Sequence, residues 1–327
     1  MSESQIIDQF GRKHTYLRIS LTDRCNLRCF YCMPEEGSEM ADKPHVMKLE
    51  EIVALSKIFV SMGVDTIRLT GGEPLIRKNF GFLVENLAEL GVKLKLTTNG
   101  ILLDQYYDLF EKVGLKSINV SLDSLDKTRM AFITKRDYYD RIMANVREGL
   151  KRGFEIKLNV VLIKGVNDKE IIDFIELTRD SKVQIKFIEF MPFKGNKWDW
   201  SKGVSEEEIL SVAKTHFGGL DVLENPAHST SSNYAIPGFK GSFGLVSTIT
   251  NPFCDDCNRI RLTADGKMKN CLFATKETDL LTPFREGAQI EGLIIQSIKE
   301  KKYSRDGMDK MVSSHFEKNR SMVSIGG

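Results

Sequence analysis

The sequence lacks the features that mark membrane-spanning, secreted and nucleic-acid-binding proteins. It contains no apolar run of about 18 residues or more, which excludes a transmembrane helix. Its opening stretch, MSESQIIDQFGRKH, has no apolar segment of the kind found in secretory signals. The formal net charge is only +2, too small for a protein held by the nucleic-acid backbone. We therefore expect a cytoplasmic location and neither a membrane nor a nucleic-acid partner.

Phosphate-binding glycine loops are absent, and cysteines are few. Neither GxxxxGK followed by Ser or Thr nor GxGxxG occurs, so phosphate would have to be held by side chains. Six cysteines in 327 residues could form three disulfides, but such frameworks belong to small secreted scaffolds. Metal or redox chemistry is therefore the favoured interpretation of the cysteines.

The chain alternates short apolar strands with amphipathic helices. Six strands are predicted, at Tyr16–Thr22, Asp65–Thr70, Lys93–Thr98, Ser117–Asp123, Glu155–Ile163 and Val183–Phe190. The helices predicted between them are Leu49–Met62, Phe80–Leu90, Tyr106–Val113, Tyr139–Arg152 and Asp168–Ser181, four of which stop before a glycine. Alternation of this kind predicts a parallel sheet with right-handed crossovers.

One face of nearly every predicted strand is polar, whereas a parallel sheet buried on both faces should be apolar throughout. A closed eight-stranded barrel likewise fills its interior with branched apolar side chains. The pattern therefore favours a wider or an incomplete barrel that holds an anionic ligand. Six cations could face that ligand and would suit a triphosphate: Arg18, Arg68, Lys157, Lys186, Arg259 and Arg261. The alternative is a sheet with one solvated face, whose cations pair with acids such as Asp123 and Glu189.

The pattern changes after about residue 195. The later part is predicted to contain a capped helix at Ser205–Phe217, an Asp-Gly hairpin formed by Arg259–Thr263 and Lys267–Phe273, and a last helix at Leu293–Lys301. We therefore divide the chain into residues 1–195, an incomplete (βα)6 barrel, and residues 196–327, an elaboration packed on that barrel.

The first three cysteines, Cys25, Cys29 and Cys32, lie in the loop after the first predicted strand. Thiolates hold 4Fe–4S clusters, and three of them leave one iron open to a ligand from outside the protein. The alternative is zinc, whose sites pair cysteines or combine them with histidine. No histidine lies within ten residues after Cys32. The spacing, with Tyr31 before the last cysteine, is typical of radical S-adenosylmethionine (SAM) enzymes.

Two further motifs carry candidate chemistry. Thr70–Pro74 (TGGEP) ends the second predicted strand, where α/β folds place their sites, and its glycines allow a ligand to approach the backbone. This motif resembles the one that binds the amino group of SAM. The second cysteine triplet, Cys254, Cys257 and Cys271, flanks the predicted hairpin. Alone, it suits a zinc knuckle as well as an iron–sulfur cluster.

Together the motifs resemble those of the GTP 3′,8-cyclase family of molybdenum cofactor biosynthesis. The matching segments run from about Phe10 to Gly327. They include LRISLTDRCNLRCFYCMP, IRLTGGEPLIR, LTTNG, INVSLD, KLNVV, FIEFM, CDDCNRIRLTADGKMKNCLF and MVSIGG. The resemblance implies a radical-SAM partial barrel that uses SAM and two 4Fe–4S clusters.

The resemblance also implies roles for individual residues. The first cluster would be bound by Cys25, Cys29 and Cys32, and the second by Cys254, Cys257 and Cys271. SAM would contact Tyr31, Gly72, Ser121 and Met191. GTP would contact Arg18, Arg68, Thr97, Lys157, Lys186, Arg259, Ile260 and Arg261. The family commonly has arginine at the position of Lys186, and lysine supplies charge without a bidentate fork.

Catalytic roles would fall to the first cysteine triplet, to Arg259 and Arg261, and to a tail ending in Gly326 and Gly327. The segment before these glycines, Met322–Ile325, is apolar enough to dock on the barrel, unlike a solvated tail. Glycines carry no side chain, so a strand that ends in them could pass a narrow opening and reach bound ligands. We predict that the tail helps to order GTP and SAM.

The implied reaction begins with one electron passed into bound SAM. The resulting 5′-deoxyadenosyl radical removes hydrogen from ribose C3′ of GTP, and C3′ then bonds to guanine C8. The product is (8S)-3′,8-cyclo-7,8-dihydroguanosine 5′-triphosphate, so the enzyme would be a carbon–carbon lyase.

The implied partners are an external one-electron donor such as flavodoxin or ferredoxin and a downstream cyclic pyranopterin monophosphate synthase, and a homodimer is left open. The alternatives are another two-cluster radical-SAM enzyme that acts on a peptide, and a zinc-binding nucleic-acid protein.

Overall fold

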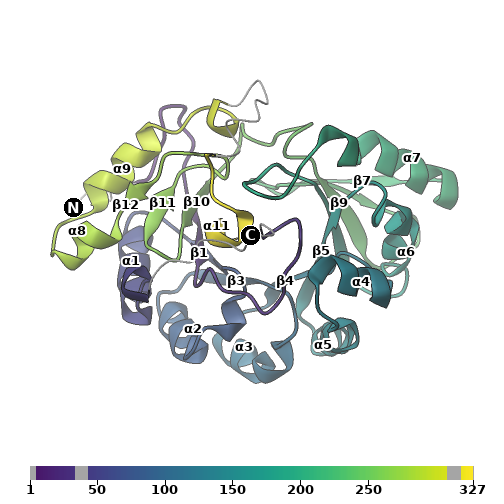
Figure 1. Cartoon of the computed structure of the whole chain (residues 1–327), viewed down its shortest axis with the longest axis horizontal. Helices are drawn as coiled ribbons and strands as arrows, with labels where there is room; N and C mark the ends of the chain where they lie inside the picture. Colours follow the sequence, from purple (N-terminus) through teal and green to yellow (C-terminus); the bar gives the residue numbers. More distant parts are fainter. Residues whose placement is uncertain (1–4, 34–42, 308–317, 327) are drawn as a thin grey trace.

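The structure, a computed structural model, describes residues 5–33, 43–307 and 318–326, and these form one curved sheet of twelve strands (Figure 1). Six strands follow one another and pair in parallel through the centre of the sheet. They are β1 (Tyr16–Ser20), β2 (Thr66–Thr70), β3 (Lys93–Thr98), β4 (Ser117–Ser121), β5 (Glu155–Leu162) and β6 (Gln184–Glu189). The six predicted strands and their parallel order are thus confirmed.

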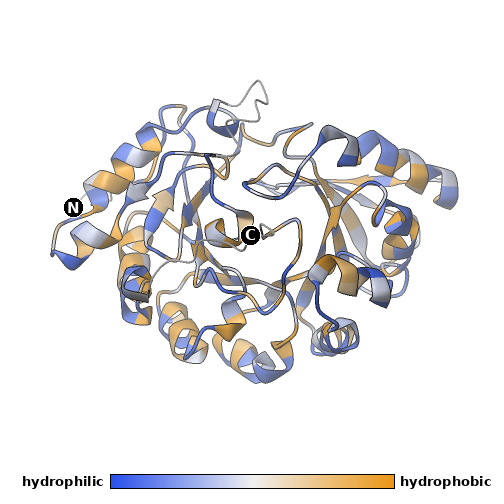
Figure 2. Cartoon of the chain, in the orientation of Figure 1, coloured by the Kyte–Doolittle hydropathy of each residue, from blue (hydrophilic) through white to orange (hydrophobic). Residues whose placement is uncertain are grey.

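Helices cover the outer, convex face of this sheet (Figure 1). They are α1 (Leu49–Ser61), α2 (Phe80–Ala88), α3 (Tyr107–Val113), α4 (Lys127–Thr134), α5 (Tyr139–Lys151) and α6 (Ile171–Glu176). Helix α1 presents an apolar stripe to the sheet with Ile52, Leu55 and Phe59, none of them exposed. Hydrophobic and hydrophilic residues accordingly alternate along the strands and helices (Figure 2). The core therefore lies between the sheet and the outer helices, and the concave face is left for polar residues.

The later part of the chain extends both edges of the same sheet. At one edge β10 (Arg259–Leu262) runs parallel to β1, and β11 (Lys267–Lys269) and β12 (Thr278–Asp279) follow in antiparallel order. At the other edge β9 (Ser242–Val246) runs parallel to β6, followed by β8 (Ser232–Ala235) and β7 (Asp221–Leu223). The elaboration thus continues the partial barrel at both ends, and the division at residue 195 stays a prediction.

The later helices are α7 (Glu206–Phe217), α8 (Leu281–Arg285), α9 (Glu291–Lys299) and α11 (Met322–Ile325). The predicted cap of α7 is confirmed, because the Ser205 hydroxyl accepts from the Glu208 amide at 3.1 Å and the Glu208 carboxylate accepts from the Ser205 amide at 2.8 Å. Short 3-10 turns lie at Lys43–His45, Pro74–Ile76, Leu103–Gln105, Asp168–Glu170, Trp200–Lys202 and Arg305–Gly307. Within the described residues, no helix has the length and apolar character needed to cross a membrane.

The helix predicted at Asp168–Ser181 is shorter than expected. The chain forms a 3-10 turn at Asp168–Glu170 and then α6, which ends at Glu176. Beyond this point the carbonyl of Thr178 accepts from the Gly241 amide at 2.9 Å, and the carbonyl of Arg179 accepts from the Lys240 amide at 3.1 Å. These residues pair with the segment that leads into β9, so they do not continue the helix.

Candidate active site

The first cysteine triplet lies in the loop after β1, where the TGGEP segment after β2 supports it. The carbonyl of Thr22 accepts from the Gly72 amide at 2.7 Å, and the carbonyl of Arg24 accepts from the Glu73 amide at 2.8 Å. A Cβ atom at Gly72 would lie 2.2 Å from the Arg24 carbonyl oxygen. Only glycine therefore lets the two loops pair, and the TGGEP segment fixes the backbone just before Cys25.

Glu73, the acid of the TGGEP segment, is turned inward and joins the ends of β2 and β3. Its carboxylate accepts hydrogen bonds from the Leu75 amide at 2.9 Å, the Thr98 hydroxyl at 2.8 Å and the Asn99 amide at 2.7 Å. Burial raises the pKa of Glu73 to about 7. The Glu73 carboxylate is thus occupied in stabilising the loop. A ligand at this motif would therefore contact its backbone atoms.

The three thiols of this loop are partly buried, and their charges act on one another. The Leu27 amide donates to the Cys25 sulfur at 3.3 Å, and the Asn99 amide group donates to it at 3.8 Å. Burial raises the pKa of Cys25 to about 11 and that of Cys32 to about 12, and the pKa of Cys29 rises through burial, Asp123 and the two neighbouring thiols. Neighbouring thiols whose pKa is raised need a positive centre to become thiolates. The loop therefore fits a metal centre.

All six cysteines are unpaired. In the described part of the chain, no three or more His, Cys, Asp or Glu side chains form a group that could hold a metal ion. A 4Fe–4S cube spreads its thiolate ligands over separate irons, so it requires them farther apart than one ion would.

The four residues predicted to contact SAM lie at the carboxyl ends of strands or in the loops that follow them. The Tyr31 hydroxyl donates to the Asp123 carboxylate at 2.6 Å, and this carboxylate also accepts from the Val161 amide at 2.9 Å. Ser121 is the last residue of β4, and Met191 follows β6. With Gly72 they lie at the same edge of the sheet as the first triplet, as ligand sites of parallel sheets do. Their contacts with SAM stay predictions.

The predicted cations come together on the concave face. Arg18 lies in register with Arg68 on one side and with Arg261 on the other. Burial lowers the pKa of Arg18, as do the charges of Arg261, Arg68 and Arg259. We call the set Arg18, Arg68, Lys95, Lys157, Lys186, Arg259 and Arg261 the cation row.

One member of this row, Lys95, is not among the cations predicted from the sequence. Burial lowers the pKa of Lys157, and the charges of Lys95 and Arg68 lower it further. The Lys95 ammonium also lies 5.8 Å from the centre of the Tyr16 ring. Alternation of Lys93, Lys95 and Thr97 along β3 is the signal that could have found it.

The acids proposed to neutralise these cations are held elsewhere. Asp123 is bonded to Tyr31 and Val161, and the Glu189 carboxylate accepts from the Ile249 amide at 2.7 Å and the Thr250 amide at 3.2 Å. Among the described residues, no carboxylate forms an ion pair with any of Arg68, Lys95, Lys157, Lys186, Arg259 and Arg261. The alternative of a solvated face with paired charges is therefore wrong for these residues, and the row is suited to an anion.

Some members of the predicted GTP set also serve the fold. Arg68 donates to the Tyr16 hydroxyl at 2.6 Å, to the Leu96 carbonyl at 2.8 Å and to the Thr97 hydroxyl at 3.2 Å. The side chain of Ile260 is fully buried, at 0% exposure, so any contact with GTP would come from its backbone. Lys157, by contrast, forms no side-chain hydrogen bond or ion pair with another described residue, which leaves its charge available.

The second cysteine triplet lies at the opposite end of the strands. Cys254 and Cys257 precede β10, and Cys271 follows β11, which pairs with β10 in antiparallel order. The hairpin thereby returns Cys271 to the beginning of β10, beside the beginning of β1. The first triplet follows the other end of β1, so the cation row lies between the two triplets.

The tail lies inside the curve of the sheet (Figure 1). The Arg261 guanidinium donates to the Gly326 carbonyl at 2.9 Å. A Cβ at Gly326, whose φ is +83°, would lie 2.6 Å from the Thr70 hydroxyl oxygen. Met322–Ile325 forms a short helix and not the predicted strand, because Ile325 packs sideways into a cluster with Phe193, Ile249 and Phe273. Gly327 lies outside the described residues.

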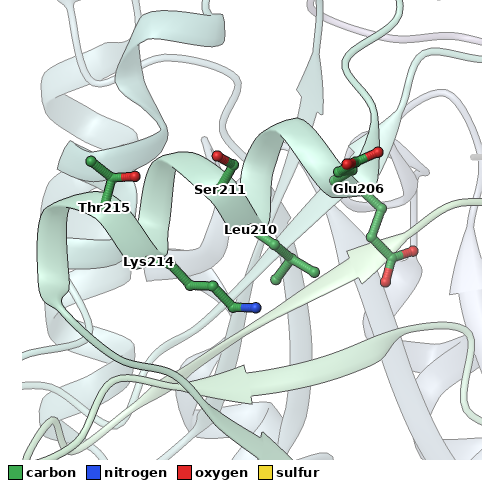
Figure 3. A pocket seen from close by; sticks show the side chains of 6 residues that line it. Glu206, Leu210, Ser211, Lys214 and Thr215 are labelled. Carbon is green, nitrogen blue, oxygen red and sulfur yellow. The ribbon is translucent and has the colours of Figure 1, made fainter.

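A separate surface cavity of about 560 Å³ lies along α7 (Figure 3). Glu206, Leu210, Ser211, Lys214 and Thr215 line it. It contains no cysteine and no member of the cation row, and we assign it no part in the site.

Comparison with known proteins shows which class of protein this chain belongs to. The Radical SAM superfamily matches residues 19–178, and the family Molybdenum Cofactor Synthesis C matches residues 183–306. The fold resembles that of Streptococcus suis SuiB bound to precursor peptide SuiA, with a TM-score of 0.56, 14% identity and coverage of 94% of this chain and 66% of that one. The chain is a radical SAM protein.

More similar relatives give the family. "GTP 3′,8-cyclase, mitochondrial" of Arabidopsis thaliana is 44% identical over 98% of this chain and 83% of its own length. "GTP 3′,8-cyclase" of Peptoclostridium acidaminophilum is 42% identical over 92% of this chain and 93% of its own length. The chain spans about half of several relatives named "Molybdenum cofactor biosynthesis protein 1", as in Dictyostelium discoideum, where it is 43% identical over 52% of that protein. The chain belongs to the GTP 3′,8-cyclase family.

Proposed function

We propose that the chain converts GTP to (8S)-3′,8-cyclo-7,8-dihydroguanosine 5′-triphosphate, the first step of molybdenum cofactor biosynthesis. The observation that carries the proposal is the cation row on the concave face, between two cysteine triplets at opposite ends of the strands. Six cations of this row have no carboxylate partner among the described residues, and this suits a triphosphate better than a peptide, while the inward placement of the row does not suit nucleic acid. Anaerobic incubation with GTP, SAM and dithionite should give an isomer of GTP together with 5′-deoxyadenosine. Unchanged GTP beside intact clusters would overturn the proposal.

The two triplets would hold the iron–sulfur groups: Cys25, Cys29 and Cys32 the cluster that binds SAM, and Cys254, Cys257 and Cys271 the second. When bound, these groups supply one-electron reduction of SAM and an open iron for the guanine base. The protein's own part is positioning. The cation row holds the triphosphate, and the residues at the carboxyl ends of the strands hold SAM. The tail closes the space between them, so that ribose C3′ faces the SAM site and water is excluded.

Replacing Lys157 by alanine is expected to weaken GTP binding roughly tenfold to a hundredfold, the worth of one charge-assisted contact. SAM binding should change much less, because Lys157 lies on the strand face and the SAM site follows the strand ends. Equilibrium binding of each ligand to the anaerobic protein measures both effects. Lys93→Ala, which removes an exposed lysine from the start of β3, is the matched control. Equal weakening of both ligands would show that Lys157 is structural.

GTP affinity is expected to depend on pH through Lys186. Burial, followed by the charge of Lys157, lowers the pKa of Lys186 to about 7. Its ammonium donates to the Ser231 hydroxyl and, at 2.7 Å, to the Asn233 side-chain oxygen, neutral partners that leave its charge uncompensated. Below pH 7 the lysine is charged and attracts phosphate, and above pH 7 that attraction is lost. GTP affinity should therefore fall as the pH rises from 6 to 8, by up to roughly tenfold.

Lys186→Arg is the matched control for this pH dependence, because arginine stays charged while the phosphates titrate in both proteins. The Lys186 side chain packs directly on Gly244, where a Cβ would lie 2.9 Å from the Lys186 nitrogen. The variant should bind GTP with a flatter pH profile. The same profile in both proteins would remove Lys186 from the triphosphate site.

The remaining partners follow from the reaction. A one-electron donor such as flavodoxin or ferredoxin, a cyclic pyranopterin monophosphate synthase that takes the product, and a cytoplasmic location are part of the proposal. A homodimer is a further prediction that size measurement in solution would test.

A further inference from the structure

A buried lysine lies behind the second cysteine triplet. Lys301 follows α9 and is only 3% exposed. Its ammonium donates to the Cys257 sulfur at 3.6 Å and to the Arg259 carbonyl at 3.2 Å. The charge of Lys301 also acts on Cys271, so it faces two of the three thiols.

This lysine has no carboxylate partner among the described residues. A buried ammonium is costly unless it is both hydrogen-bonded and balanced by negative charge. The Arg259 carbonyl satisfies one N–H group but supplies no net charge. The thiolate ligands of the second triplet can supply that negative charge. This points to a charge pair between Lys301 and the metal centre that these thiolates hold.

The segment that carries Lys301 is tied to the cysteine loop by the beginning of the chain. The Arg12 guanidinium donates to the Cys254 carbonyl at 2.6 Å and to the Tyr303 carbonyl at 2.8 Å. Asp8 accepts from Arg12 at 2.6 Å, which fixes the guanidinium, and the Gln9 amide group donates to the Lys301 carbonyl at 3.0 Å. Hydrogen bonds from Arg12 and Gln9 thus hold both the segment of Lys301 and the loop of Cys254. The fold therefore sets the distance between the lysine and the thiols.

We infer that Lys301 is a positioning residue for the second iron–sulfur cluster, holding the Cys257 thiolate through a charged N–H···S bond and raising the reduction potential of that cluster. The inference rests on the proposed function only in that the second triplet holds a 4Fe–4S cluster. Hydrogen bonds to sulfur and nearby charge are what set the potential of such clusters. A charged donor is roughly twice as strong as a neutral one.

The experiment isolates the second cluster in the full-length chain. Replacing Cys25, Cys29 and Cys32 by alanine removes the first cluster, and the parent and its Lys301→Met derivative are then titrated potentiometrically with detection by electron paramagnetic resonance. At the midpoint potential of the parent, the ratio of reduced to oxidised cluster should be at least about tenfold lower in the derivative. This equals a lowering of the midpoint potential by about 59 mV for one electron. Lys301→Arg should restore most of the shift. Lys299→Met, which removes an exposed lysine from the end of α9, should leave the potential at the parent's value.

The outcomes separate the inference from the proposed function. A Lys301→Met cluster with the parent's potential overturns the inference alone. A parent that binds zinc or no metal at the second triplet overturns the proposed function and the inference with it. If the methionine derivative does not fold, as judged by circular dichroism, Lys301→Gln replaces it. That variant keeps an N–H donor without the charge and should still lower the potential, and an unchanged value would again overturn the inference.

Discussion

Cys25→Ser is expected to abolish cleavage of SAM, whereas Cys271→Ser should leave some cleavage but no product from GTP. Serine lacks the thiolate that the first cluster requires, and without this cluster no electron reaches SAM. Cys271 belongs to the triplet at the other end of the strands, so its loss misplaces GTP while the SAM site stays intact. Each variant should keep about four irons per chain, against about eight in the parent.

The measurement is release of 5′-deoxyadenosine beside formation of cyclised product, with iron and sulfide analysis of the same anaerobic samples. Circular dichroism of each variant controls for folding. Equal loss of SAM cleavage in both variants would contradict the assignment of the two triplets to different ligands.

Removing Gly326 and Gly327 is expected to lower turnover by at least about two orders of magnitude while folding and iron content are kept. The Gly326 carbonyl accepts from Arg261, a member of the cation row, at 2.9 Å, so the tail helps to place a side chain that is to meet GTP. A misplacement of about 1 Å at a catalytic site can cost on the order of a hundredfold in rate. A synthetic peptide of the C-terminal segment should restore part of the activity.

A single substitution tests the same contact. Gly326→Ala would bring a Cβ within 2.6 Å of the Thr70 hydroxyl oxygen at a backbone angle that side chains rarely adopt, so it should also lower turnover. Gly292→Ala is the control, because a Cβ there meets nothing within 4 Å. Full activity in the truncated chain would remove the tail from the mechanism.

The central sheet could be predicted because its signals are local. Strand β5 alternates buried and partly exposed residues throughout Glu155–Leu162, and glycine follows closely after α1, α3 and α5. Helix α4 is not predicted because its apolar residues form no single stripe, with Met130 buried but Phe132 56% exposed. Strands β7 to β9 are only three to five residues long, so they form by pairing in sequence from β6 outward and not by their own propensity.

The arrangement of the site depends on contacts between residues far apart in the chain, which the sequence pattern does not predict. The motifs alone identify both triplets, but their placement at opposite ends of the strands requires β10 to pair in parallel with β1, far away in sequence. The inward turn of Glu73 follows from donors on β3 and the loop after it, which no motif predicts. The short helix of the tail likewise follows from the cluster of Phe193, Ile249 and Phe273 that receives Ile325.

The central claim is that this chain takes hydrogen from ribose C3′ of GTP held between the two triplets. GTP deuterated only at C3′ tests it directly, in an anaerobic single-turnover reaction with SAM and dithionite analysed by mass spectrometry. The account predicts that one deuterium appears in 5′-deoxyadenosine and that the cyclised product has lost it. Deuterium-free 5′-deoxyadenosine, with the label still in recovered GTP or in a product, would contradict it.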